Sequence, residues 1–177
     1  FFKYKNVGVA TARAGNVIGG GDWSEDRLVP DIIRSIEGNS NLKIRKPKAI
    51  RPWQHVLDPS FGYLSLLEKL FKNPSKFSGS WNFGPMKSKA KNVEYLVESL
   101  FSKFDTNISW SIDKSDSPFE FDNLHLDSGK AEAKLGWRPG WDLEQAITGV
   151  VDWHKDYMKT KDVLKLCRDQ IKEFIFD

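Results

Sequence analysis

Short extended runs alternate with helical patterns along the whole chain, and this alternation constrains the fold more than any other feature. The runs of strand character are residues 7–12, 42–45, 80–83, 107–112 and 124–126. Apolar side chains recur at helical spacing in residues 28–36, 63–71, 93–104, 128–135, 143–153 and 161–174. Strands that alternate with helices predict the α/β class with a partly parallel sheet, here as a single structural unit.

Polar residues mark the expected starts of several helices. Asp58 followed by Pro59 is typical of an N-cap and the first helical position. Asn92, Asp127 and Asp142 are likewise expected to cap the helices that follow them.

Charge patterning limits the partners of the chain. The 27 basic and 24 acidic side chains give a formal net charge of +3 and are interspersed along most of the sequence. The exception is residues 43–51, where five Lys and Arg occur without an acid between them. A nucleic-acid binder would be expected to segregate its basic residues over a longer stretch. This short cluster therefore favours a small phosphorylated ligand and argues against a nucleic-acid partner.

The cysteine content and the lack of targeting segments indicate the cellular compartment of the protein. The one cysteine, Cys167, excludes an intramolecular disulfide and indicates a reducing compartment. No apolar run approaches membrane-spanning length and no signal peptide is visible, so we expect a cytoplasmic protein without a membrane partner. The chain has no initiating Met and enters its first predicted strand almost at once, which predicts a fragment of a longer protein.

A glycine-rich stretch, residues 12–23, follows the first predicted strand. Glycine lets the backbone approach a ligand closely and present N–H groups to an anion, although a plain tight turn is an alternative. The Gly-x-Gly-x-x-Gly spacing at the opening of a helix is missing, so the stretch is not a dinucleotide fingerprint.

A second segment, residues 49–59, holds Arg51 immediately before a proline. The proline favours an extended conformation for Arg51, whose planar guanidinium can bind a diphosphate. The alternative for Arg51 is an ordinary surface salt bridge. His55, in the same segment, is expected to be a structural histidine rather than a catalyst.

Five motifs together carry a family resemblance. They are Arg-x-x-Asn-Val-x-Gly, an Arg-Leu-x-Pro helix start, Arg-Pro-Trp-Gln-His-Val-Leu-x-Pro, Trp-Asn-Phe-Gly-Pro and Leu-Asp-x-x-Lys-Ala-x-x-x-Leu-Gly-Trp-x-Pro. In this order they resemble the later half of the extended short-chain dehydrogenase/reductase family. Residues 14–23, 51–56 and 167–171 look like its CDP-glucose 4,6-dehydratase branch. The resemblance implies that residues 1–177 are the substrate-binding, carboxy-terminal portion of a Rossmann-type fold whose cofactor-binding half is absent.

The same resemblance implies which residues bind the nucleotide sugar. Asn16 would hydrogen-bond the substrate near its diphosphate, and Arg51 would clamp the diphosphate. Arg45 would border the base, where its guanidinium could stack on cytosine. Arg27 and Leu28 would contact the nucleotide at the start of a helix.

The same resemblance implies a contact with the cofactor, and the sequence differs from the branch at one position. Ala14 would lie beside the nicotinamide of NAD, with its backbone serving the carboxamide. Trp23 is expected either to wall the pocket or to pack in the core. Where the branch has Pro-His-Glu, this chain has Pro118, Phe119 and Glu120. Phe119 cannot donate the histidine's hydrogen bond, which leaves Glu120 as the polar candidate there.

The implied activity is that of an NAD-dependent lyase that converts CDP-glucose to CDP-4-keto-6-deoxyglucose and water, as a homo-oligomer when intact. The sugar C4 loses hydride, water leaves across C5 and C6, and hydride returns to C6. The family's Tyr-x-x-x-Lys pair would lie upstream, and we interpret the same spacing at Tyr157 and Lys161 as coincidence. We therefore expect no catalytic residue in this chain and no activity from it alone. Two alternatives are another sugar-nucleotide epimerase or dehydratase of the family and a non-catalytic sugar-nucleotide-binding module.

Overall fold

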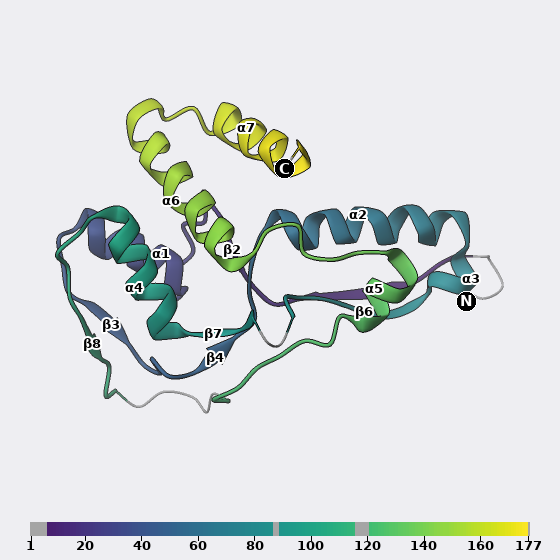
Figure 1. Cartoon of the computed structure of the whole chain (residues 1–177), viewed down its shortest axis with the longest axis horizontal. Helices are drawn as coiled ribbons and strands as arrows, with labels where there is room; N and C mark the ends of the chain where they lie inside the picture. The colour runs from purple at the N-terminus through teal and green to yellow at the C-terminus, as the bar shows by residue number, and fades with distance from the viewer. Residues whose placement is uncertain (1–6, 87–88, 116–120, 177) are drawn as a thin grey trace.

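The computed structural model describes residues 7–86, 89–115 and 121–176, in which strands and helices alternate (Figure 1). The strands are β1 (Ala10–Ala14), β2 (Asn16–Ile18), β3 (Leu42–Ile44), β4 (Ile50–Arg51), β5 (Trp53–His55), β6 (Gly79–Phe83), β7 (Lys91–Asn92) and β8 (Trp110–Ile112). The helices are α1 (Leu28–Glu37), α2 (Leu57–Lys72), α3 (Pro74–Phe77), α4 (Val93–Phe104), α5 (Gly129–Leu135), α6 (Leu143–Thr160) and α7 (Val163–Phe176). The predicted α/β class is confirmed.

Strand pairing is mostly parallel. In the described residues β1 pairs with β6, β2 with β5 and β3 with β8 in parallel, whereas β4 pairs with β7 antiparallel. Parallel pairs need a long crossover, and helices supply these connections, as the alternating pattern predicted.

Two hydrophobic cores divide the structure into two regions. The larger core joins side chains from β2, β3, β5, α1, α4 and α6, and we call this region the cavity lobe. The smaller core contains Leu66, Phe77, Trp81, Phe83, Ala131 and Trp137. It lies in a region formed by β1, β6, α2, α3 and α5, which we call the α2 arm because α2 runs along its length (Figure 1).

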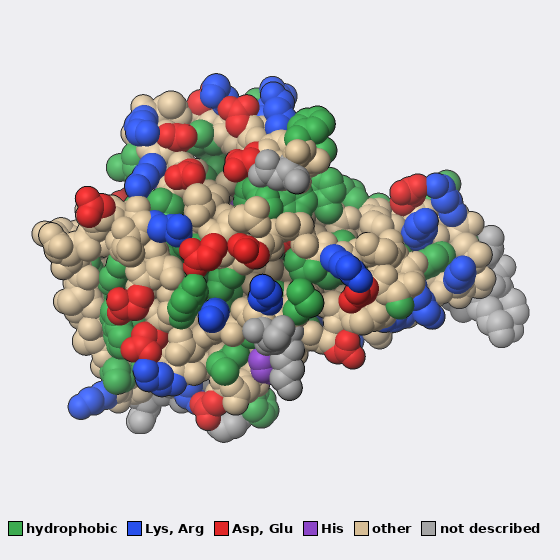
Figure 2. Space-filling model, in the orientation of Figure 1, with side chains coloured by type: hydrophobic (Ala, Val, Ile, Leu, Met, Phe, Trp, Pro, Cys, Tyr) green, Lys and Arg blue, Asp and Glu red, His purple; other side chains and the backbone are tan. Residues whose placement is uncertain are grey.

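The last helix joins the two regions. Phe174 of α7 packs against Phe61 of α2, with ring centroids 5.1 Å apart, and against Trp141, which precedes α6. Apolar side chains gather where α7 lies over the first turns of α2, whereas charged side chains are spread over the rest of this face (Figure 2). No helix among the described residues combines the length and apolar character needed to cross a membrane.

The glycine-rich stretch differs from its prediction. The first strand begins at Ala10 rather than Val7, and Asn16–Ile18 forms β2 instead of a loop, because it pairs with β5, a strand that the sequence did not predict. A Cβ on Gly20 would lie 2.1 Å from the Trp153 ring. Gly20 is therefore needed for packing on α6.

The helix starts are partly as predicted. Asn92 accepts from Tyr95 N at 2.9 Å, and Asp142 caps α6 in a reciprocal bond with Gln145, so both predicted caps are confirmed. Asp58 is not an N-cap, because α2 begins at Leu57 and the buried Asp58 carboxylate accepts from Gly140 N at 2.6 Å. Asp127 lies one residue too early, since the N-cap of α5 is Ser128.

The last helix begins two residues later than the pattern predicted. Lys161 adopts the left-handed conformation, with φ of 55°, and is the C-cap of α6. It therefore ends one helix instead of starting the next, and α7 begins at Val163.

Candidate functional site

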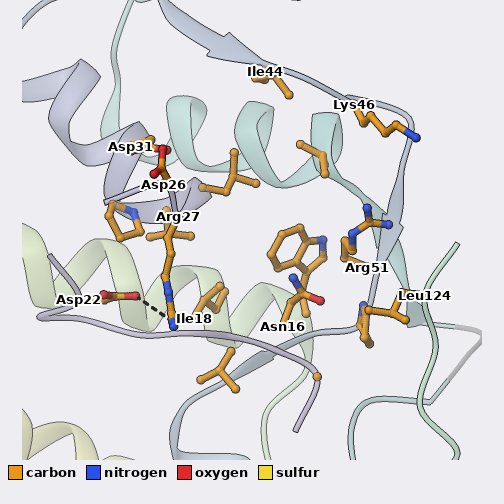
Figure 3. Close-up of a pocket in the computed structure, with 18 of the residues that line it drawn as sticks. Asn16, Ile18, Asp22, Asp26, Arg27, Asp31, Ile44, Lys46, Arg51 and Leu124 are labelled. Carbon is orange, nitrogen blue, oxygen red and sulfur yellow. Dashed lines mark ion pairs between the residues drawn. The ribbon is translucent and has the colours of Figure 1, made fainter. Parts of the chain in front are cut away.

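A cavity of about 650 Å³ opens in the cavity lobe, where the carboxyl end of β1 meets β2 and the first turn of α1 (Figure 3). The segment from β3 to β5 forms another wall. Ligands of open α/β sheets bind at the carboxyl ends of parallel strands, and this cavity has that position relative to β1.

Six of the seven residues predicted to bind substrate or cofactor line this one cavity. They are Ala14, Asn16, Arg27, Leu28, Arg45 and Arg51. The seventh, Glu120, and its neighbour Phe119 lie outside the described residues. The structure thus brings the predicted positions together, and their individual roles stay predictions.

Arg51 is buried and held in place. Its residue is only 5% exposed, and its guanidinium donates to Ile50 O at 2.9 Å and to Asp122 O at 3.4 Å. At this exposure Arg51 is not a surface side chain. A buried guanidinium fixed by backbone carbonyls is preorganised for an anion in the cavity.

Asn16 reaches the same wall because two loops approach each other closely. Asn16 N donates to Pro52 O at 2.9 Å, and a Cβ on Gly15 would lie 2.3 Å from that oxygen. Only glycine fits there, so Gly15 sets the approach that brings Asn16 beside Arg51 (Figure 3).

Acidic groups lie on the other side of the cavity, around the start of α1. Asp22 is 3.7 Å from the guanidinium of Arg27 (Figure 3). Partial burial acts to raise the pKa of Asp22, but hydrogen bonds from Ser24 and the charge of Arg27 outweigh it and lower that pKa. Asp22 is therefore ionised at neutral pH and holds Arg27 at the cavity.

Sequence reasoning missed some cavity residues. Asp22, Asp26, Asp31, Ile44 and Lys46 line the cavity without having been proposed as ligands. Lys46 belongs to the basic run that had been recognised, so its signal was present. The acids carried no signal, because their position depends on the turn before α1.

His55 and Trp23, two further residues singled out in the sequence, are both packed against other parts of the protein. His55 is completely buried, its Nδ1 accepts from Leu57 N at 3.4 Å, and burial lowers its pKa to about 4. Trp23 is not among the described residues that line the cavity, and its ring packs on His154 and Tyr157 of α6, with centroids 5.4 Å away in each case.

Solved structures share this fold. A UDP-glucuronic acid 4-epimerase from Bacillus cereus, solved with UDP-glucuronic acid and NAD, matches with a TM-score of 0.73 at 19% identity, over 88% of this chain and 48% of its own. A UDP-glucose 4-epimerase from Stenotrophomonas maltophila has a TM-score of 0.74 at 16% identity, over 89% and 50%. A dTDP-glucose 4,6-dehydratase from Bacillus anthracis has a TM-score of 0.64 at 19% identity, over 91% and 48%. The fold is that of the extended short-chain dehydrogenase/reductase enzymes that epimerise or dehydrate nucleotide sugars.

One relative of known function is much more similar in sequence than these solved structures. The CDP-glucose 4,6-dehydratase of Salmonella typhimurium is 43% identical over 174 residues, which are 98% of this chain and 48% of the relative. No family model matches the sequence. The chain is a homologue of CDP-glucose 4,6-dehydratase, as its motifs predicted, and it spans about half the length of that enzyme.

Proposed function

We propose that this chain is the part of an NAD-dependent CDP-glucose 4,6-dehydratase that binds the nucleotide diphosphate of the substrate. The observation that carries the proposal is the convergence of Asn16 and Arg51 on one cavity, set by the contact of Gly15 with Pro52. A buried, fixed guanidinium beside a side-chain amide suits a diphosphate, because both groups donate hydrogen bonds to phosphate oxygens.

Other residues of the cavity walls would bind the remainder of the nucleotide. Arg45 follows β3 directly, where its guanidinium can stack on a base. Leu28 and Arg27 occupy the first turn and the N-cap position of α1 across the cavity. Between these walls the cytidine has an apolar contact and hydrogen-bond donors, while the diphosphate lies toward Arg51.

Ala14 is the cofactor-binding candidate in this chain. Gly15 N donates to Phe83 O of β6, and successive residues of a strand direct their backbone groups to opposite sides. Ala14 therefore turns its N–H and C=O away from β6, which suits a donor and an acceptor for a carboxamide. NAD, when bound, supplies a site that accepts and returns hydride.

A different nucleotide sugar is the second candidate, because the solved structures above act on UDP and dTDP sugars. The 43% identity to a CDP-glucose enzyme favours the first. Discrimination between the bases depends on the wall formed by Arg45 and Leu28, since all these ligands share the diphosphate.

The test is a chimeric enzyme in which this chain replaces the aligned segment of the Salmonella dehydratase. With NAD⁺ present, we expect turnover of CDP-glucose and little turnover of dTDP-, UDP- or GDP-glucose. Preference for another nucleotide would establish the second candidate. A chimera that binds CDP-glucose without turning it over would instead support a non-catalytic binding module.

The isolated chain should bind CDP weakly and should not dehydrate CDP-glucose. The reason is that the resemblance implies a catalytic pair upstream of these residues, together with the other wall of the substrate pocket. Turnover by the purified chain with NAD⁺ would show that catalytic residues lie among these 177.

A further inference from the structure

A second cavity, of about 800 Å³, adjoins the candidate nucleotide cavity. Trp53 and Leu126 line both cavities and form the wall between them. The other walls come from the end of β6, from residues 125–129 and from the segment that joins α5 to α6. Pockets for small molecules have volumes of roughly 300–1,000 Å³, so the second cavity is large enough for a ligand of its own.

The aromatic wall of the second cavity is held in a fixed arrangement. Trp53, Trp137 and Trp141 all line it. The indole N–H of Trp53 donates to Lys91 O at 3.2 Å, and that of Trp137 donates to Asp58 O at 3.1 Å. These two rings are therefore positioned by their own hydrogen bonds, and the wall is formed before any ligand enters.

Trp141 differs from the other two tryptophans. Its ring packs against His55 and Phe174, with centroids 4.7 Å and 5.4 Å away, and the residue is only 6% exposed. Its indole N–H is buried and has no hydrogen-bond partner among the residues that the structure describes. A buried tryptophan N–H usually finds a partner, so Trp141 leaves one donor unused in this wall.

Gln54 leaves an acceptor unused in the same wall. It is 3% exposed, and its Nε2 donates to Phe83 O at 2.8 Å, which fixes the orientation of the amide. Its Oε1 is buried without a partner in the described part of the chain, as is Nδ1 of His125, another residue of this cavity. An unpaired buried group loses its hydration without compensation, and native structures contain few of them. Their concentration around one cavity points to a ligand.

We propose that the second cavity binds a neutral, planar heterocycle that carries both a carbonyl group and an N–H, as lactams and heteroaromatic amides do. The tryptophan rings offer flat apolar contact, the carbonyl accepts from Trp141, and the N–H donates to Gln54 Oε1. A neutral ligand fits because acids of the wall already have partners. Asp127 accepts from Gly129 N at 2.9 Å, and Asp142 caps α6.

The shared wall couples the second cavity to the candidate nucleotide cavity. Trp53 lines both, pairs with Asn16 across β5 and β2, and lies two residues after Arg51. A ligand that packs on one side of Trp53 therefore acts on the wall that holds the nucleotide on the other side. Coupling of this kind is reciprocal, so each ligand changes the affinity of the other by the same factor. This consequence rests on the proposed function, whereas the second site itself does not.

The first test is an NMR titration of the isotope-labelled chain with 2-quinolinone, a neutral bicyclic lactam, in the absence of CDP. We expect saturable shifts of the indole N–H signals of Trp53, Trp137 and Trp141, with the Trp141 proton moving downfield as it becomes hydrogen-bonded. Trp81 and Trp110 do not line the cavity and should not shift. 1-Methyl-2-quinolinone lacks the N–H and should bind about tenfold more weakly. Absence of saturable shifts, or equal binding of both compounds, would overturn the proposal.

The second test removes the unused donor. Trp141→Phe keeps an aromatic ring but loses the indole N–H, and we expect it to weaken 2-quinolinone binding about five- to tenfold. Trp110→Phe is the matched control, because the Trp110 N–H donates to Glu98 at 2.7 Å, away from the cavity. Circular dichroism checks that both variants fold, and the comparison of the two quinolinones on the unchanged chain decides the question if Trp141→Phe does not. Equal affinity of Trp141→Phe and the unchanged chain would contradict the assigned donor.

The coupling is tested by measuring CDP affinity calorimetrically with and without saturating 2-quinolinone. We expect the two values to differ by at least about twofold, and CDP to change the affinity for 2-quinolinone by the same factor. An unchanged CDP affinity would overturn the coupling through Trp53. Because the first titration contains no CDP, its failure is distinguishable from failure of the proposed function.

Discussion

The cavity lobe and the α2 arm bury their apolar side chains to different degrees. In the lobe, Ile32, Leu96 and Ile147 come from three different helices and are all completely buried. In the arm, Trp81 and Phe83 are equally well buried, but the next face of α2 leaves Leu67 exposed. The lobe is therefore a finished packing unit that contains the proposed ligand site. The arm leaves an apolar face of α2 exposed to solvent.

Acid should act in opposite directions on groups of the two regions, and this is the largest effect that we expect. Burial lowers the pKa of His55 and of His154 from 6.5 to about 4, so each contributes stability above pH 6.5 that is lost as the pH falls through 4. Each contribution is on the order of 3 kcal/mol. Burial raises the pKa of Asp58, in α2, from 3.8 to about 6, so its contribution is present below 3.8 and lost as the pH rises through 6.

The combined pH-dependent contribution of His55 and His154 to the free energy of unfolding exceeds the opposite contribution of Asp58. The free energy of unfolding, measured by denaturant titration, should fall between pH 6.5 and pH 4. Asp58→Asn should make the fall steeper, because it removes the opposing group, and His154→Gln should make it shallower. A stability that rises across this range would mean that the histidines are not held neutral.

Truncating a leucine should cost much more stability in the cavity lobe than on the exposed face of α2. Leu100→Ala removes a completely buried side chain of α4 and should cost about 2–5 kcal/mol in the free energy of unfolding. Leu67→Ala, on the exposed face of α2, should change it by less than about 0.5 kcal/mol. A similar cost at both sites would show that α2 is already covered in the isolated chain.

Arg51→Ala should weaken substrate binding by about 1.5–3 kcal/mol, because it removes a charge-assisted hydrogen bond to the diphosphate. The affinity of the chimeric enzyme for CDP-glucose, measured calorimetrically, checks this value. Arg138→Ala is a matched control, because that arginine pairs with Glu132 at the surface of the arm, away from the cavity. An unchanged affinity in Arg51→Ala would remove the residue from the site.

The smallest predicted effect concerns a helix cap of the cavity lobe. Asn92→Ala removes the side chain that accepts from Tyr95 N and should cost about 1 kcal/mol in the free energy of unfolding. Asn107→Ala, at an exposed position outside any helix or strand, should cost less than about 0.5 kcal/mol. Thermal unfolding of both variants tests the difference.

Local signals predicted most of the elements but not the short strands. Apolar periodicity predicted α1, α4 and α6, because each buries one face on the larger core. β2 and β5 were missed, since each has three residues and is defined by pairing across the chain. The sequence likewise suggested a cap at Asp58, whereas the tertiary contact with Gly140 determines its role.

The candidate site was predicted through motifs rather than through composition. Single residues such as Arg51 allowed a plain structural role, and only the order of motifs connected it with Asn16. The sequence did not predict the close contact that joins them, because the need for glycine at Gly15 depends on the position of Pro52. The acids around Asp22 were missed for a similar reason.

An NMR titration of the isotope-labelled chain with CDP tests the central claim most directly. We predict saturable shifts of the backbone amides of Gly15, Asn16 and Arg51, with those of Arg45 moving along the same binding curve. Shifts that do not saturate, or that occur mainly at residues remote from this cavity, would contradict the claim that the two loops together bind the pyrophosphate of a cytidine nucleotide.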